Sequence, residues 1–580
     1  MLKAIWRYTK VFKGVKMPWI LLLIFVALSV VNTNVEVESV TLTASIIDGT
    51  QNSVNTDLLV RYVVYIVLSG LLTIATTYIS GLAYQKINMG VRLRMWNKMM
   101  RLPTRFYDGD NANGLVTRIT TDADSACYFF QVIIGIGTTI YAGIVAFIQL
   151  YNYQPSMAFA SLGILPLMAG VALLYGWLTY RTGAETRNRL AKTMSYLAER
   201  VTGMRLIKSF STQEEENKKA DHLFRKQCSA DIKLSLTSMV QYAGMELIGC
   251  ISIVIAFGYG GYLVSTGEMS IGKLIGFYSL SSLLSVRVVA LLTYFSTLAQ
   301  NAGIMQKIGA VLELPDEKSE GHEMDVEDAD IHVDHVDFAY GTQPVLKDLT
   351  VTIPKGKVTA IIGTNGAGKT TLFKLLERMY VPSSGVIQFG DTNIEEFSLS
   401  SWRKSFAIVA QDKPLLSGTV RENILYGVER KVSEEELVKV AKMANAYDFI
   451  METPGGFDAQ VGPGGSNFSG GQQQCIVIAR AMMRNPDYLL LDEATSNLDV
   501  KSEQLVTAAL QNLMKGRTTI LIAHNHSATQ FADQVIVMRG GKIEDCGTPE
   551  ELLERSKYYQ TFARKGEKAA FYEFKTDLLF

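Results

Sequence analysis

The chain has 580 residues, and its 56 basic and 56 acidic residues give a formal net charge of zero. This length is too great for one ordinary domain, and the balanced charge gives no general attraction to nucleic acid, so we expect no nucleic-acid partner. The five cysteines lie far apart without a Cys-x-x-Cys pair, which argues against a disulfide framework or a zinc site.

Charge is distributed unevenly at the N-terminus. The first 35 residues contain five basic residues and no acid, whereas residues 36–57 contain four acids and no base. The apolar run Met17–Val35 ends where the acids begin. A basic flank, an apolar run and an acidic outer loop are expected of a membrane helix whose N-terminus stays in the cytoplasm. A cleaved signal peptide is the alternative, but no small-residue cleavage site follows the run cleanly.

Five further apolar runs precede residue 310, and each is long enough for a membrane span, which takes about 20 helical residues. The stretch between Asp124 and Arg181 has no Asp, Glu, Lys or Arg, and Pro155 divides it into two helices joined by an outer loop at Tyr151–Ser156. The other runs are Tyr62–Gln85, Leu234–Gly267 and Leu274–Gln306. Six crossings predict a multi-pass protein of the plasma membrane, in contact with membrane lipid and with both termini in the cytoplasm.

Two long charged joints, residues 86–124 and 181–233, separate the spans on the cytoplasmic side. Apolar residues at helical spacing predict that both are helical extensions of the membrane helices. The last two spans carry one charge each, Glu246 and Arg287, at similar depths along their helices. Because a charge inside a membrane is costly, we expect both to line one cavity of a substrate pathway. A structural ion pair, or an arginine that reaches the headgroups, is the alternative.

A change of composition marks the boundary between two domains. Residues 313–330 are acidic, contain Pro315 and lack periodicity, which predicts a linker. We therefore expect an all-α transmembrane domain over 1–312 and an α/β domain over 331–560, where short apolar strands alternate with helices. Residues 561–580 are expected to form a C-terminal tail.

A complete phosphate-binding loop, Gly-Thr-Asn-Gly-Ala-Gly-Lys-Thr, occupies residues 363–370. Its glycines let backbone N–H groups point at phosphate oxygens, Lys369 reaches the β- and γ-phosphates, and the Thr370 hydroxyl can bind Mg²⁺. The residues assigned to ATP in this loop are Gly363, Thr364, Asn365, Gly366, Ala367, Gly368, Lys369, Thr370 and Thr371.

A second glycine-rich turn, Phe468–Gln472, opens a later helix. Backbone amides and a serine hydroxyl at such a helix start can also meet a phosphate. The residues assigned to nucleotide binding here are Ser469, Gly470, Gly471 and Gln472.

Polar side chains follow several apolar strands of the α/β domain. Asp492 and Glu493 lie at the end of one strand, where a parallel sheet binds ligands. Asp492 is suited to hold Mg²⁺ through water, and Glu493 can polarise the water that attacks the γ-phosphorus. Gln411 can reach Mg²⁺ and the attacking water, and His524 can contact the γ-phosphate. Tyr340, near the start of the domain, can stack on adenine.

Together these motifs closely resemble those of the ATP-binding cassette family, specifically its exporter-type half-transporters. The resemblance covers nearly all of residues 1–560. In this resemblance Tyr340 corresponds to the aromatic loop, Gly363–Thr370 to Walker A and Gln411 to the glutamine loop. Phe468–Gln472 corresponds to the signature, and Asp492 with Glu493 to the end of Walker B and the catalytic glutamate. Ser496–Asp499 corresponds to the D-loop and His524 to the switch histidine.

The resemblance implies a head-to-tail dimer, either a homodimer or a heterodimer with a second half-transporter. Each ATP would lie between the phosphate loop of one chain and the signature of the other. Spans 4 and 5 would cross to the other half, and short coupling helices near Asn111–Val116 and Met204–Ser209 would press on the nucleotide domains. The chain departs from the family pattern at Pro463, Gln473, Cys475 and His526.

These features predict an ATP-driven pump that moves an amphipathic drug, lipid or peptide outward. An ATP-gated channel, a regulatory ATPase and an importer built on the exporter architecture are the alternatives. A channel would often carry an added regulatory segment, which we do not find in the sequence.

Overall fold

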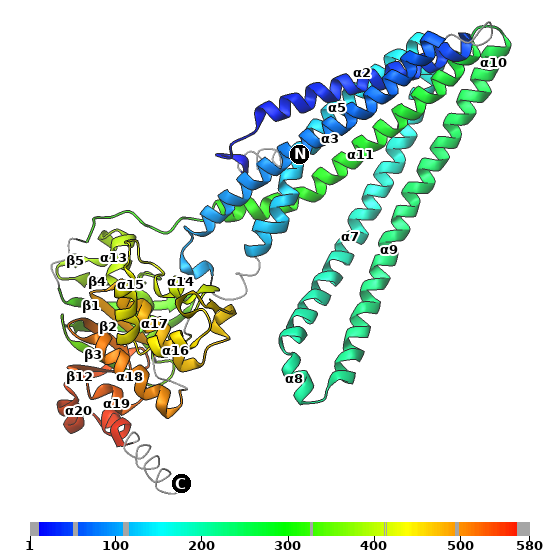
Figure 1. Cartoon of the computed structure of the whole chain (residues 1–580). Coiled ribbons are helices and arrows are strands. Elements are labelled where there is room, and N and C mark those ends of the chain that lie inside the picture. Colours follow the sequence, from blue (N-terminus) through cyan, green and yellow to red (C-terminus); the bar gives the residue numbers. More distant parts are fainter. Residues whose placement is uncertain are drawn as a thin grey trace. The chain divides into compact units, whose positions relative to one another are not determined.

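The computed structural model describes residues 11–49, 56–107, 115–324, 329–410, 412, 415–492 and 498–564. These residues form two compact units (Figure 1). One contains the residues up to Arg101 and those from 115 to Pro315, and the other contains Leu102–Tyr107 and the residues from Asp316 onward. Within the second unit, the Thr104 hydroxyl lies 3.1 Å from the Met379 sulfur.

The described part of the first unit is mostly helical, and six of its helical stretches are long and apolar enough to span a membrane. Its helices are α2 (Trp19–Gly49), α3 (Thr56–Met99), α5 (Ala123–Tyr153), α6 (Pro155–Leu162), α7 (Ile164–Thr202), α8 (Met204–Ser209), α9 (Gln213–Ile253), α10 (Gly260–Ser265) and α11 (Ile271–Leu312). Two π-helical segments, Arg118–Asp122 and Val254–Tyr259, continue into α5 and α10.

Helices α2, α3, α5 and α11 pack together, whereas α7 and α9 form a long hairpin that diverges from them toward α8 (Figure 1). The charged joint 181–233 lies on α7, α8 and α9 and is helical as expected. The joint 86–124 is helical where α3 continues to Met99 and again from residue 115, and its residues 108–114 lie outside the described residues. The predicted coupling segment Met204–Ser209 coincides with α8, and most of the other one, Asn111–Val116, lies outside the described residues. The outer turn between α5 and α6 is shorter than predicted, because only Gln154 separates the two helices.

The acidic outer loop predicted over residues 36–57 is wrong, because α2 continues to Gly49. Glu36 therefore lies on the helix and forms an ion pair with Arg287 of α11. Asp48 also has a structural partner, since its carboxylate accepts hydrogen bonds from the Ser270 hydroxyl at 2.6 Å and the Gly272 amide at 2.8 Å. These contacts let a helix contain acids that would otherwise favour a solvated loop.

The pair between Glu36 and Arg287 gives Arg287 a structural partner that was not expected, and the role of Glu246 and Arg287 in a substrate pathway stays a prediction. The side chains of Glu36 and Arg287 are 34% and 28% exposed, and the Arg287 Nε is buried without a partner among the described residues. Glu246 is exposed on α9 and makes no ion pair within the described part of the chain. The sequence does not reveal Glu36 as the partner, because its acid-rich segment is typical of a loop outside the span.

The second unit is an α/β fold with two main sheets. A six-stranded sheet has the order β12 (Lys542–Gly547), β11 (Gln534–Arg539), β3 (Val358–Gly363), β10 (Thr518–Ile522), β9 (Tyr488–Asp492) and β6 (Phe406–Val409), and all of its pairs are parallel except β11 with β12. An antiparallel sheet contains β2 (Gln343–Ile353), β1 (Ile331–Tyr340), β4 (Ser384–Phe389) and β5 (Thr392–Asn393), and a small pair joins β7 (Gly418–Thr419) to β8 (Gln460–Val461).

The helices of this unit are α12 (Lys369–Leu376), α13 (Leu399–Ser405), α14 (Val420–Ile424), α15 (Glu434–Met443), α16 (Tyr447–Glu452), α17 (Gly470–Arg484), α18 (Val500–Met514), α19 (His526–Thr529) and α20 (Pro549–Arg555). A further helical segment covers residues 557–564, across the boundary at 560 predicted for the tail.

The parallel sheet has a hydrophobic core on each face, because successive side chains of a strand point to opposite sides. In β3, Ala360 and Ile362 belong to the core under α17 and α18, whereas Ile361 belongs to the core shared with α12 and the antiparallel sheet. Burial on both faces explains why these strands read as continuous apolar runs in the sequence.

The described part of the linker packs on this unit. Arg403 of α13 and Glu317 form a bidentate ion pair, with Nη2 and Nη1 at 2.7 and 3.1 Å from the carboxylate oxygens. Further along, the His322 amide donates to the Glu396 carbonyl, and the His322 carbonyl accepts from the Ser398 amide. The linker is thus ordered around these contacts by partners that its own sequence does not reveal.

Candidate nucleotide-binding site

The phosphate-binding loop joins β3 to α12, as the sequence indicates. A side chain at Gly363 would place a Cβ 2.2 Å from the Met538 carbonyl oxygen, so only glycine lets β3 end so close to β11. Gly368 has a φ of 99°, a left-handed conformation that glycine adopts without steric cost. These glycines therefore allow the tight turn from the end of β3 to the start of α12.

Lys369 lies over this loop. Its ammonium group donates hydrogen bonds to the Gly363 carbonyl at 2.9 Å and the Thr364 carbonyl at 3.2 Å, and the residue is only 7% exposed. An ammonium group held by two loop carbonyls lies where a phosphate bound to the loop would need a positive charge.

Residues far apart in sequence converge beside the loop. The Thr370 hydroxyl lies 3.5 Å from an Asp492 carboxylate oxygen, across 122 residues of sequence. Asp492 ends β9 opposite Ile522 of β10, so His524, two residues further on, follows the strand next to Asp492 at the same edge of the sheet. The structure thus brings Lys369, Thr370, Asp492 and His524 to one edge, as carboxyl ends of parallel strands require.

Two predicted catalytic residues, Gln411 and Glu493, lie outside the described residues. Residues close to them in the sequence are described. Val409, two residues before Gln411, ends β6 opposite Leu491 of β9, and Asp492 directly precedes Glu493. Their assignments as water-positioning residues remain predictions.

Tyr340 belongs to an aromatic cluster at the end of β1. Its ring packs edge-on against Phe338 and Tyr380, with centroids 4.9 and 5.2 Å away. The Lys374 ammonium lies 5.6 Å from the Tyr340 ring and 5.7 Å from the Tyr380 ring. Tyr380 and Lys374 were not among the residues predicted for the site, although both follow the phosphate loop closely in the sequence. Stacking of Tyr340 on adenine remains a prediction.

The second glycine-rich motif starts α17. The Ser469 hydroxyl accepts from the Gln472 amide at 3.3 Å, and the Gln472 side chain accepts from the Ser469 amide at 2.9 Å, which together form a capping box. Gly471 is buried against Ser502 of α18, and a Cβ there would lie 2.6 Å from the Ser502 Cβ. Ser469 and Gly470 are exposed at this helix start.

The four departures from the family pattern have local structural roles. Gln473 donates to the Gly465 carbonyl at 2.8 Å and the Phe468 carbonyl at 3.0 Å, so it fastens the loop before the signature. Pro463 begins the short 3₁₀ turn of that loop. Cys475 is buried in the core, and burial raises the pKa of its thiol to about 12. This pKa makes the thiol unreactive near neutral pH.

The fourth departure, His526, packs against the C-terminal helical segment. Its ring lies edge-on to Tyr559, 5.9 Å between centroids, and its Nδ1 is 3.3 Å from the Thr529 hydroxyl. His526 thus connects α19 with the C-terminal helical segment, which gives it a packing role two residues from His524.

An acid with an unusual pKa lies behind the phosphate loop, at the end of α12. Burial raises the pKa of Glu377 from 4.5 to about 7, and the charge of Asp492 adds to this, whereas Arg403 and Lys374 oppose it. Glu377 is half-buried. Its ionisation is therefore linked to the packing of the helix that carries Lys369 and Thr370.

The donor set suits a nucleotide polyphosphate with a hard divalent cation. A glycine-rich turn and a lysine ammonium offer hydrogen-bond donors to phosphate oxygens. The Thr370 hydroxyl and the Asp492 carboxylate are close enough to share one cation, and oxygen ligands are those that Mg²⁺ prefers.

Comparison with known proteins supports both parts of this organisation. Residues 21–288 match the family model described as ABC transporter transmembrane region, and residues 346–496 match the family model described as ABC transporter. A multidrug resistance ABC transporter ATP-binding and permease protein of Lactococcus lactis subsp. cremoris is 29% identical over 576 residues, which cover 96% of this chain and 95% of the relative.

A Staphylococcus aureus ATP-binding/permease protein named for multidrug export is 32% identical over 501 residues, or 83% of this chain and 84% of the relative. The match runs through both units, and six apolar helices precede a nucleotide-binding α/β fold in one chain. The chain therefore belongs to the ABC transporter family as an exporter-type half-transporter, whose ATPase activity is coupled to transport.

Proposed function

We propose that this half-transporter works as a dimer that binds and hydrolyses Mg²⁺-ATP to export amphipathic substrates across the plasma membrane. The dimer is a homodimer or a heterodimer with a second half-transporter. The observation that carries the proposal is the convergence of Lys369, Thr370 and Asp492 on one sheet edge in a chain with six helices long enough to span a membrane. The names of its relatives, which refer to multidrug resistance and multidrug export, support drug-like substrates.

The proposal gives each residue of the site one role. The backbone amides of residues 363–368 and the Lys369 ammonium bind and orient the phosphates, and Thr370 with Asp492 would hold Mg²⁺. When bound, the cation neutralises charge that develops during phosphoryl transfer. Glu493 orients and polarises the attacking water, assisted by Gln411, and His524 contacts the γ-phosphate from the adjacent strand.

The exposed Ser469 completes the site of the other chain in this proposal. Its hydroxyl lies at the N-terminus of the 15-residue helix α17, where backbone amides and the helix dipole favour an anion. The signature of each chain then closes over the nucleotide held by the phosphate loop of the other. ATP binding joins the two nucleotide domains, and hydrolysis lets them separate.

Mixed dimers that combine Lys369→Ala with Ser469→Ala test this head-to-tail arrangement. Two affinity tags isolate dimers with one chain of each kind. With both changes on one chain, each of the two sites loses one group, whereas with the changes on opposite chains one site loses both groups and the other is intact. We expect the second arrangement to retain clearly more ATPase activity, and equal residual activities would contradict the proposal.

A further inference from the structure

Between α3 and α5 the chain passes from the first unit into the second and back. Helix α3 ends at Met99, and Leu102–Tyr107 belong to the second unit, where the Thr104 hydroxyl lies 3.1 Å from the Met379 sulfur. The chain is described again in the first unit from residue 115, and α5 begins at Ala123. Helices α3 and α5 are therefore the two elements through which a displacement of this segment enters the first unit.

These two helices pack mainly against different partners. Helix α3 packs mostly on α2, whereas α5 packs mostly on α11. The buried residues of α3 all lie in its C-terminal half: Ala83, Ile87, Asn88, Val91, Met95 and Met99. Asn88 is the only polar residue among them. The polar contacts of Asn88 show how α3 is joined to α5.

Asp124, in the first turn of α5, collects hydrogen bonds from one face of α3. Its carboxylate Oδ1 accepts from the Asn88 side-chain amide at 2.6 Å and from the Arg92 guanidinium at 2.9 Å. The Tyr84 hydroxyl donates to the Asp124 backbone carbonyl at 3.3 Å. Residues 84, 88 and 92 are four apart, so they share one face of the helix. We call Asn88, Arg92 and Asp124 the Asp124 cluster.

The buried part of the Asp124 cluster is its stronger part. The side chains of Arg92 and Asp124 are 43% and 44% exposed, so water screens their ion pair and it contributes little by itself. Asn88 is only 4% exposed, and loss of its acceptor would leave a buried donor unpaired, which is costly. A π-helical segment, Arg118–Asp122, directly precedes α5, and such segments are frequent at functional sites.

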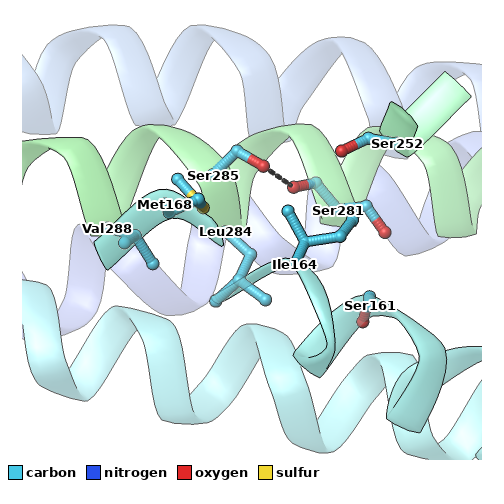
Figure 2. Close-up of a pocket in the computed structure, with 8 residues that line it drawn as sticks. All are labelled: Ser161, Ile164, Met168, Ser252, Ser281, Leu284, Ser285 and Val288. Atoms are coloured by element: carbon cyan, nitrogen blue, oxygen red, sulfur yellow. Dashed lines mark hydrogen bonds between the residues drawn. The ribbon is translucent and has the colours of Figure 1, made fainter. Parts of the chain in front are cut away.

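The hairpin of α7 and α9 is joined to the bundle in a different way. A pocket of about 10 Å³, which is room for about one water molecule, lies between α6, α7, α9 and α11 (Figure 2). Four serines and four apolar residues line it, and none of them carries a charge. The hydroxyl of Ser281 in this lining is buried without a hydrogen-bond partner among the described residues. The lining of this junction thus supplies no ion pair, whereas the junction of α3 with α5 has one.

We propose that the Asp124 cluster keeps α3 and α5 together when nucleotide binding and hydrolysis displace the segment between them. Asp124 is then a positioning residue, because it acts by holding two helices of the first unit, whereas the nucleotide-site residues belong to the second. Coupling between distant sites is carried by rigid elements and hydrogen-bond networks. With the Asp124 cluster intact, α3 and α5 move as one body, and their partners α2 and α11 receive the same displacement.

The distance between two spin labels measures whether α3 and α5 stay together. Met89 of α3 and Tyr128 of α5 are 63% and 42% exposed and adjoin the Asp124 cluster in sequence, so cysteines at these positions can carry the labels. The three native cysteines that are not buried are first replaced by serine. The full chain in lipid nanodiscs, mixed with an excess of unlabelled chain, is measured by pulsed EPR with and without Mg²⁺-ATP and vanadate.

In the chain with an intact Asp124 cluster we expect one distance that is the same in both states. In Asp124→Ala it should lengthen by roughly 5 Å, about half the axial separation of packed helices, when nucleotide is trapped. A merely structural loss would change the distance equally with and without nucleotide. Asp48→Ala is the matched control, because the Asp48 carboxylate also accepts two hydrogen bonds between helices, from Ser270 and Gly272. It should leave the distance constant.

Two further variants assign the effect to the hydrogen bond between the helices. Asn88→Ala removes the same bond from the other side and should give the same lengthening, so the test does not depend on one variant. Asn88→Asp with Asp124→Asn exchanges the two side chains, so an amide still faces a carboxylate, and the constant distance should return. The amount of vanadate-trapped nucleotide is measured in each variant, and a normal amount shows that the second unit is folded and active.

Four results would overturn the inference. The first is a distance that changes with nucleotide although the Asp124 cluster is intact. The second is a distance that stays constant in both Asp124→Ala and Asn88→Ala, which would show that α3 and α5 move together without the Asp124 cluster. The others are an equal lengthening in Asp48→Ala and no recovery after the exchange of the two side chains.

Discussion

The raised pKa of Glu377 predicts that the stability of the fold behind the phosphate loop depends on pH. Glu377→Gln should remove this dependence. The folded-state pKa is about 7, against 4.5 for an ordinary glutamate, so the folded chain binds this proton more tightly than the unfolded chain. Stability is therefore greatest below pH 4.5 and falls as the pH rises toward 7 and above. At about 1.4 kcal/mol for each unit of difference between the two pKa values, the loss in free energy of unfolding has an upper limit of about 3.4 kcal/mol.

Amide hydrogen exchange in α12 measures this effect where it should arise. The ratio of exchange rates between wild type and Glu377→Gln is taken at each pH, so that the intrinsic pH dependence of exchange cancels. We expect a ratio near one at pH 5 and slower exchange in the variant at pH 8, by roughly tenfold to a hundredfold for about 1.4–2.7 kcal/mol.

Glu396→Gln provides the control, because Glu396 is an exposed acid of the same domain. It should leave the ratio close to one at both pH values. A ratio for Glu377→Gln that is the same at pH 5 and pH 8 would refute the link between burial and proton binding, whatever the size of the ratio.

Three further predictions concern the active site, the membrane bundle and the signature loop. Glu493→Gln should lower ATP turnover by at least about a hundredfold while ATP still binds, as expected for a group that acts on water; near wild-type turnover with rapid nucleotide release would contradict its role. Arg287→Met should lower the thermal midpoint in detergent by more than the double change Arg287→Met with Glu36→Gln, because only the single change leaves a half-buried charge unpaired; additive shifts would show that the pair is not coupled. Gln473→Ala should speed exchange in residues 462–468 by roughly tenfold, since two hydrogen bonds to that loop are lost; unchanged protection would exclude the fastening role.

The structure confirmed those predictions that depend on residues close together in the sequence. Apolar runs of span length became helices, and the phosphate loop joined a strand to a helix, because both depend on residues that are neighbours in the chain. Asp492 and His524 were found at strand ends for the same reason, since a buried parallel strand is recognisable as an apolar run.

Contacts between distant residues were decided only by the tertiary structure. The sequence contains both Glu36 and Arg287, but a charge does not specify its partner, and the pairing depends on how α2 packs against α11. The same holds for Asn88, Arg92 and Asp124, which lie on two helices and meet only because α3 packs against α5. Local periodicity thus determined the elements, whereas their packing determined which polar groups meet, because a partner becomes available only when two elements approach within hydrogen-bonding distance.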